Sequence, residues 1–310
     1  MLIPGEIDEI CKLRQQIETD LRARAPDVLD RFPPEAYLAF FDGLPAIAPY
    51  HLVPAQAWAF CTGIEAQGGP EALEAYHRLA MLHLIARPAP SAIRLTDGMR
   101  DLRQRYLTRI VVDMRSPRKR FYRHGNDLFA KDFAVCRGKL QPGGVELVDI
   151  CAGVGRRVLL GGGFGQFLRG AWFFLGRAGG FAPFLALHFD RRLIGEFDAD
   201  GYAALYLRVA DLLSANPHIL GVMSDSWWHD PCLAEISPEL GHIGREPESA
   251  GARLFRGAEN RAATADATRF APRRAALHRS GAYRPRVHLL AWARRDMLAW
   301  AERYRAGHSG

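Results

Sequence analysis

The spacing of hydrophobic and polar positions divides this chain into a helical first third and a mixed remainder. From residue 7 to residue 25 the apolar positions recur at steps of three and four, which predicts an amphipathic helix. Pro34 and Pro70 stand where two further helices begin, over residues 35–41 and 71–86. The pair Pro88 and Pro90 is expected to end the last of them. We therefore predict a helical N-terminal region over residues 1–105.

From residue 106 the pattern changes to short apolar runs separated by turn residues. The runs at 107–115, 128–140 and 145–155 are typical of antiparallel strands, and Pro142-Gly143-Gly144 is typical of the turn between two of them. A late run at 286–292 predicts another strand. We predict that residues 106–310 form one domain with a mixed sheet, so that the fold class of the chain is α/β.

The clearest unit lies in the middle of this second region. An apolar run at 184–189 predicts a buried strand, helical spacing follows over 201–214, and a second apolar run at 219–224 predicts another strand. The first strand ends on His188 and Asp190, and the second leads into the sequence Ser-Asp-Ser-Trp-Trp-His-Asp at 224–230. Open α/β sheets bind ligands at the carboxyl ends of their strands, so we expect the functional site there.

Composition narrows the possible partners. The net charge is +7, but only four of the 41 basic residues are lysine and the arginines are spread along the chain, so we predict no nucleic-acid partner. Five cysteines without a C-x-x-C pair predict reduced thiols, a cytoplasmic location and no bound metal. The first residues lack the pattern of a signal peptide, and no apolar run approaches the roughly 18 residues of a membrane span.

A glycine-rich loop between the strand that begins at 145 and the next helix is the first candidate for cofactor binding. Backbone amides at a helix N-terminus can hold a pyrophosphate, and arginines add charge-assisted hydrogen bonds. Neither a Walker A motif nor a dinucleotide fingerprint is present. Close backbone packing or a tight turn is the alternative explanation of the glycines. The candidate residues are Arg156, Arg157, Gly161, Gly162, Gly163 and Gly165.

The order of these elements resembles the GCN5-related N-acetyltransferase (GNAT) superfamily over about residues 106–292. The resemblance implies transfer of an acyl group from acyl-CoA or an acyl-carrier protein to a small-molecule amine, with the thioester's pyrophosphate bound by a loop after the fourth strand. The family motif is Arg/Gln-x-x-Gly-x-Gly/Ala. Here Arg157 and Gly161 are separated by one residue more, which is easier to reconcile with the long-chain or carrier-dependent branch.

Acyl transfer needs a base for the attacking ammonium and an acid for the leaving thiolate. His188 is the best candidate for the base because its unperturbed pKa lies near neutrality. Asp190 or Asp225 is expected to orient it. The resemblance implies that Tyr202 or Tyr206 protonates the thiolate, although both tyrosines also fit simple core packing. His188 likewise fits a core histidine that is bonded to a carbonyl.

Two further segments are expected to contact partners. Adjacent tryptophans at a strand end cannot both face the core, so the segment with Ser224, Ser226, Trp227 and Trp228 is expected to form a substrate wall. The basic segment at 115–123 suits an acidic carrier protein, an anionic membrane surface, RNA, or simply a solvated loop. The apolar helix at 166–177 is expected to be core rather than an acyl channel, although the two roles are compatible.

Two alternatives to an acyltransferase stay open. His188 and Asp190 have the H-x-D spacing by which Fe(II)/2-oxoglutarate-type oxygenases supply two iron ligands. The third ligand would be distant in sequence, and an arginine would bind the 2-oxoglutarate carboxylate. The candidates for these roles are His242, His278 or His288, and Arg286 or Arg294. A helix directly after H-x-D argues against the β-helix that such enzymes need. The other alternative is a non-catalytic, GNAT-like binding protein.

Overall fold

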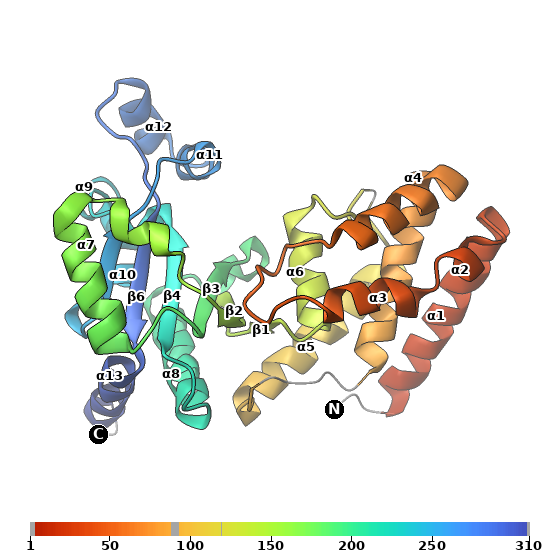
Figure 1. Cartoon of the computed structure of the whole chain (residues 1–310), viewed down its shortest axis with the longest axis horizontal. Coiled ribbons are helices and arrows are strands. Elements are labelled where there is room, and N and C mark those ends of the chain that lie inside the picture. Colours follow the sequence, from red (N-terminus) through yellow and green to blue (C-terminus); the bar gives the residue numbers. More distant parts are fainter. Residues whose placement is uncertain (1–3, 88–92, 119, 309–310) are drawn as a thin grey trace. The chain divides into compact units, whose positions relative to one another are not determined.

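A computed structural model describes residues 4–87, 93–118 and 120–308 and divides the chain into two compact units. Unit 1 is Met1–Pro142 and unit 2 is Gly143–Gly310 (Figure 1). The boundary predicted at 105/106 therefore lies inside unit 1. The predicted α/β class with a mixed sheet is confirmed. Among the described residues, no helix combines the length and apolar character required to cross a bilayer.

Unit 1 is built almost entirely from helices, and its last element is a short strand. The elements are α1 (Pro4–Arg24), α2 (Val28–Arg31), α3 (Pro34–Asp42), α4 (Ala55–Ala86), α5 (Asp97–Arg115), α6 (Asp127–Cys136) and β1 (Leu140–Pro142). The predicted stop of the third helix at Pro88 and Pro90 lies outside the described residues, and Arg87 caps α4.

The strands predicted at 107–115 and 128–140 are wrong, since residues 107–115 belong to α5 and residues 128–136 belong to α6. Leu107, Ile110, Val111 and Met114 are all buried on one side of α5, and their spacing is helical rather than alternating. α6 begins where the side chain of Asn126 accepts hydrogen bonds from the next turn. The β-branched residues of 107–115 favoured a strand, but the period of the buried positions decided the helix.

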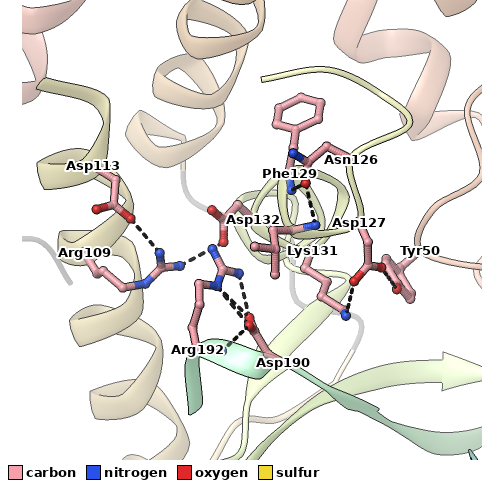
Figure 2. A network of polar contacts seen from close by, with 11 residues as sticks. Tyr50, Arg109, Asp113, Asn126, Asp127, Phe129, Lys131, Asp132, Asp190 and Arg192 are labelled. Carbon is pink, nitrogen blue, oxygen red and sulfur yellow. Dashed lines mark hydrogen bonds and ion pairs between the residues drawn. The ribbon is translucent and has the colours of Figure 1, made fainter. Parts of the chain in front are cut away.

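Acidic and basic side chains connect the helices of unit 1. Arg109 on α5 forms ion pairs at 2.8 Å with Asp113 and with the buried Asp132 on α6 (Figure 2). Asp127 at the start of α6 accepts a hydrogen bond of 2.8 Å from the Tyr50 hydroxyl and pairs with Lys131. These contacts fix α6 against α5 and against the loop that precedes α4.

The sheet of the protein is mixed and open, and its strands are arranged in the order β1-β2-β3-β4-β6-β5. β2 (Glu146–Ala152) pairs antiparallel with β3 (Phe184–Phe189), which pairs parallel with β4 (Gly221–Ser226). β6 (His288–Ala293) is antiparallel to both β4 and β5 (Arg253–Arg256). The late strand predicted at 286–292 corresponds to β6.

Helices cover both faces of this sheet in unit 2 (Figure 1). On one face the π-helical turn η2 (Trp172–Ala178), which continues α7 (Gly163–Ala171), packs Phe173 and Phe174 against Phe184 and Phe255. The opposite face packs against α8 (Ala199–Ala215) and α13 (Arg294–Gly307) through ring contacts between Trp292 and Trp300 and between Trp292 and Tyr206.

The remaining elements of unit 2 connect these layers. They are η1 (Arg156–Leu160), η3 (Arg191–Glu196), η4 (Trp227–His229), α9 (Leu233–Ile236), η5 (Pro238–Leu240), α10 (His242–Ser249), α11 (Arg261–Arg269) and α12 (Pro272–Arg279). η3 directly follows β3 in the chain, and η4 directly follows β4. α10 contacts η4.

Buried histidines predict that the protein loses stability in mild acid. Burial lowers the pKa of His77 to about 4, that of His124 to about 2 and that of His229 to about 3. An unfolded histidine binds a proton near pH ~6.5, so each contribution is complete above that pH and is lost as the pH falls towards the folded-state pKa. We expect the urea midpoint to fall between about pH 7 and about pH 5, and less steeply in His229→Gln than in a His51→Gln control. A pH-independent midpoint would contradict this.

Candidate functional site

The carboxyl ends of β3 and β4 form the candidate site, because they are parallel neighbours joined by the crossover helix α8. Their register runs from the pair Leu185–Val222 to the pair Leu187–Ser224, and each strand then continues for two more residues. His188 and Asp225 are the next residues along the two strands. Because side chains alternate along a strand, both leave the sheet on the same face. Both residues were predicted from the sequence, and the register places them at neighbouring positions on adjacent strands.

Asp225 differs from an ordinary surface aspartate. Its side chain is exposed, yet desolvation by the surrounding protein raises the pKa of its carboxyl above the usual value. On the neighbouring strand, His188 is only partly exposed and is directly opposite Leu147 of β2. The site therefore offers an imidazole and a carboxyl with a raised pKa on one face of the sheet.

The two tyrosines predicted to protonate the thiolate lie on the other face. The Tyr202 hydroxyl donates a hydrogen bond of 2.8 Å to Glu146, and Glu146 is opposite Phe189 rather than His188. The Tyr206 hydroxyl donates to the carbonyl of Ile243 at 2.9 Å. Burial raises the pKa of both phenols well above the usual value. The geometry does not support the role predicted for them, and core packing, the alternative explanation, is what the structure shows.

Asp190 is also positioned differently from the prediction. Its fully buried carboxylate accepts hydrogen bonds from the backbone N–H and the guanidinium of Arg192, at distances between 2.6 and 3.1 Å (Figure 2). Asp190 thereby caps η3. Both of its oxygens are therefore bonded to Arg192. The same bonds argue against Asp190 as an iron ligand in the H-x-D alternative.

The predicted substrate wall divides between two environments. Ser224 is buried and is opposite Leu187, on the face away from His188. The hydroxyl of Ser226 accepts a hydrogen bond from the Trp228 backbone and so begins η4. The ring of Trp228 contacts Phe189 at 5.0 Å between centroids. The end of β4 is therefore stabilised by the packing and hydrogen bonding of Ser224, Ser226 and Trp228.

Trp227 contacts a helix outside the sheet, α12, through Arg274. The guanidinium of Arg274 lies 4.9 Å from the centroid of its ring. This is the geometry of a cation–π contact. α12 is thereby held beside the end of β4.

Two histidines lie beside this strand end, and the sequence indicated a role only for His242, as a candidate third iron ligand. Within the described residues, neither ring nitrogen of the buried His229 has a hydrogen-bond partner, and Nε2 of His242 has none either. The buried indole Nε1 of Trp228 lacks a partner in the same described set. Buried polar atoms without partners are costly and point to an additional water or ligand. His229 stands in the segment 224–230, so its position next to two tryptophans was the available signal.

The glycine-rich loop serves packing in this structure. Gly161 approaches the carbonyl oxygen of Arg256 on β5 so closely that a Cβ atom would collide with it. The buried side chain of Gln166 bonds to the backbone N–H of Arg256 at 2.9 Å and to its carbonyl at 3.0 Å. Arg156, Arg157 and the remaining predicted glycines are exposed. The loop is therefore attached to the edge strand β5, which is separated from β4 by β6.

This arrangement predicts different outcomes for two glycines of the same loop. Gly161→Ala is expected to lower the free energy of unfolding by about 1–3 kcal/mol, because the added methyl group meets backbone that cannot move aside easily. Gly165→Ala is the matched control, since a Cβ at Gly165 meets nothing within 4 Å. Urea unfolding of both variants measures the difference. Equal stabilities would contradict the packing role of Gly161.

The apolar helix after this loop is only partly core, contrary to the prediction. Phe173 and Phe174 are buried, whereas Trp172 is 58% exposed and Leu175 is 66% exposed. The outward apolar side chains of η1, α7 and η2 are Leu160, Phe164, Phe167, Leu168, Trp172 and Leu175. Arg156, Arg157 and Arg169 are exposed in the same segment. Unit 2 therefore presents an apolar surface with basic residues next to it, which we call the α7 surface.

The basic segment at 115–123 lies between α5 and α6 and is partly neutralised within unit 1. Arg115 pairs with Glu9 at 2.6 Å. Arg123 pairs with Glu74 at 3.1 Å and with Glu65 at 3.4 Å. Lys119 lies outside the described residues. These pairs reduce the positive charge that the segment offers to an acidic or anionic partner.

Comparison with known proteins adds no relative to this description. No protein-family model, curated protein or solved structure matches the chain. The interpretation of the site therefore depends on the residues and contacts described above.

Proposed function

We propose that unit 2 is a GNAT-type N-acyltransferase and that an amine attacks an acyl-CoA or acyl-carrier thioester at the carboxyl ends of β3 and β4. The observation that carries the proposal is the placement of His188 and Asp225 on one face at the end of a parallel strand pair. Ligands of open α/β sheets bind at such strand ends. The strand-helix-strand order through α8 supports the same family resemblance.

The two side chains suit the two proton transfers of the reaction. The amine nitrogen forms a bond to the thioester carbonyl carbon, the C–S bond breaks, and His188 accepts the proton that the ammonium loses. The leaving thiolate needs a proton, and the raised pKa of the Asp225 carboxyl makes it a better proton carrier than an ordinary aspartate. This assignment replaces the tyrosines, which face the other side of the sheet.

The extended, amide-containing arm of the thioester donor fits the carboxyl end of the parallel pair β3 and β4. β3 and β4 each run two residues past their last registered pair. The arm of CoA or of a carrier protein contains secondary amides, which can hydrogen-bond to extended backbone as an added strand does. We place the arm there, with its thioester towards His188.

The loop at this crossover also fits the phosphates better than the loop at 156–165. Arg192 and Gly195 in η3 have the Arg-x-x-Gly spacing with which the family motif begins, although Phe197 occupies its last position and the Arg192 guanidinium already pairs with the buried Asp190. The exposed Arg191 adds a second cation. Asp198 caps α8 with its own side chain, so we assign the phosphates to η3 and not to the amides of that helix.

The α7 surface indicates the class of donor. Its exposed aromatic and aliphatic side chains fit an acyl chain. We therefore propose a long-chain acyl thioester as the donor.

Release of free thiol from acyl-CoA in the presence of a panel of amines tests the function. We expect amine-dependent release that is faster with a long acyl chain than with acetyl-CoA. Phe164→Ser with Trp172→Ser should remove the chain-length preference and leave the acetyl rate unchanged, and Ile47→Ser, an exposed apolar residue of unit 1, is the control. Tight binding without turnover would support the non-catalytic alternative, and absence of both would overturn the proposal.

A further inference from the structure

Unit 1 contains a buried cluster of side chains that the proposed function does not use. Cys61 and His77 both belong to α4 and His124 precedes α6, and all three are buried. Their candidate ligand atoms lie within 4.8 Å of one another. The hydroxyl of Tyr37, on α3, bonds to Nε2 of His124. Four donor side chains from distant parts of the sequence therefore meet in one place.

The break in α4 is what brings Cys61 and His77 together. The two residues are 16 positions apart, and a straight helix would separate them by about 24 Å. Gly69, with φ of 73°, and Pro70 interrupt the helix between them. As a result Sγ of Cys61 and Nε2 of His77 are 3.4 Å apart. A positive φ favours glycine at that position.

The local hydrogen bonds orient the donors as a metal site requires. Nδ1 of His77 donates a hydrogen bond of 2.7 Å to the carbonyl of Tyr122, which leaves the Nε2 lone pair directed at Cys61. Histidine ligands of metals characteristically have such a partner on their other nitrogen.

One ligand-to-ligand distance and the apolar surroundings fit a closed tetrahedral site. With zinc–nitrogen bonds of about 2.0–2.1 Å and zinc–sulfur bonds of about 2.3 Å, a nitrogen and a sulfur ligand lie about 3.5 Å apart. The distance from Sγ of Cys61 to Nε2 of His77 is 3.4 Å. Rings of Phe41, Phe129 and Phe133 surround His124 and make the site apolar.

We propose that Cys61, His77 and His124, with the Tyr37 oxygen as fourth ligand, bind one divalent transition-metal ion of the zinc class. Two neutral imidazoles, a thiolate and a phenolate balance the charge of such an ion, which suits a buried site. Binding forms four metal–ligand bonds and releases the Cys61 thiol proton and the Tyr37 hydroxyl proton to solvent. One sulfur and two imidazoles favour zinc over the hard cations magnesium and calcium.

Titration of the chelator-treated full-length protein with Co²⁺, a spectroscopic probe for zinc, tests the proposal. We expect one Co²⁺ per chain with a thiolate-to-cobalt charge-transfer band, displacement by Zn²⁺, and a rise in unfolding temperature on loading. Cys61→Ser should remove the band, and His77→Gln should weaken binding by more than about tenfold. Cys11→Ser on α1 and His83→Gln on α4 are the matched controls and should bind as the unaltered protein does.

X-ray absorption of the zinc-loaded unaltered protein keeps the test independent of whether the variants fold. We expect one sulfur neighbour at about 2.3 Å and nitrogen or oxygen neighbours at about 2.0–2.1 Å. A cobalt band that persists in Cys61→Ser, a zinc spectrum without sulfur, or no stoichiometric binding by the unaltered protein would overturn the proposal. In that case the four side chains form a metal-free hydrogen-bond network.

Discussion

Arg192→Ala is expected to lower the free energy of unfolding of unit 2 by about 3–5 kcal/mol, because it leaves the buried carboxylate of Asp190 without its guanidinium partner. Asp190 is fully buried, and the guanidinium donates to both of its oxygens. Of the hydrogen bonds from Arg192 to Asp190 described above, the variant would keep only the one from the backbone N–H. Urea unfolding followed by circular dichroism measures the loss.

The neighbouring arginine supplies the control for this prediction. Arg191 is exposed, and exposed substitutions usually change stability by less than about 0.5 kcal/mol. Asp190→Asn with Arg192→Ala should recover part of the stability, since the double variant has no unpaired charge. If Arg191→Ala and Arg192→Ala destabilise the protein equally, the ion pair is not what holds η3 at the end of β3.

His188→Ala is expected to lower the rate of acyl transfer by about 10²- to 10⁴-fold, the usual contribution of a general base. Its side chain shares a face of the sheet with Asp225 at the carboxyl ends of the parallel strands. The loss should appear in the turnover rate measured as amine-dependent thiol release. Binding of the acyl-CoA, measured by native mass spectrometry, should change much less.

Tyr202→Phe distinguishes this assignment from the one that the sequence favoured. The Tyr202 hydroxyl donates to Glu146 on the opposite face, so its removal should cost about 1 kcal/mol of stability and leave the transfer rate within about tenfold of the original. A Tyr202→Phe variant that folds and is inactive, beside an active His188→Ala variant, would show that acyl transfer depends on Tyr202 and not on His188.

The sequence predicted the central unit correctly because its signals are local. Apolar runs at 184–189 and 219–224 match β3 and β4, and helical spacing between them matches α8. The pairing of strands is not local. The sequence could not show that Tyr202 and His188 lie on different faces of the sheet, because that depends on the register of β2 with β3.

Two other errors have related causes. Residues 107–115 contain adjacent β-branched residues, whereas tertiary packing buries a helical stripe of α5. The glycines at 161–165 resemble a phosphate loop in composition, but Gly161 is required by its approach to Arg256. The sequence spacing of Cys61, His77 and His124 carries no metal signature, since they meet only after α4 breaks at Gly69.

Hydrogen–deuterium exchange of the full-length protein with and without a long-chain acyl-CoA tests most directly whether the reaction site lies at the ends of β3 and β4. We predict that the ligand protects the backbone amides of residues 186–198 and 222–230, together with those of the α7 surface. Protection confined to the loop at 156–165, or no change at either strand end under saturating ligand, would contradict the account.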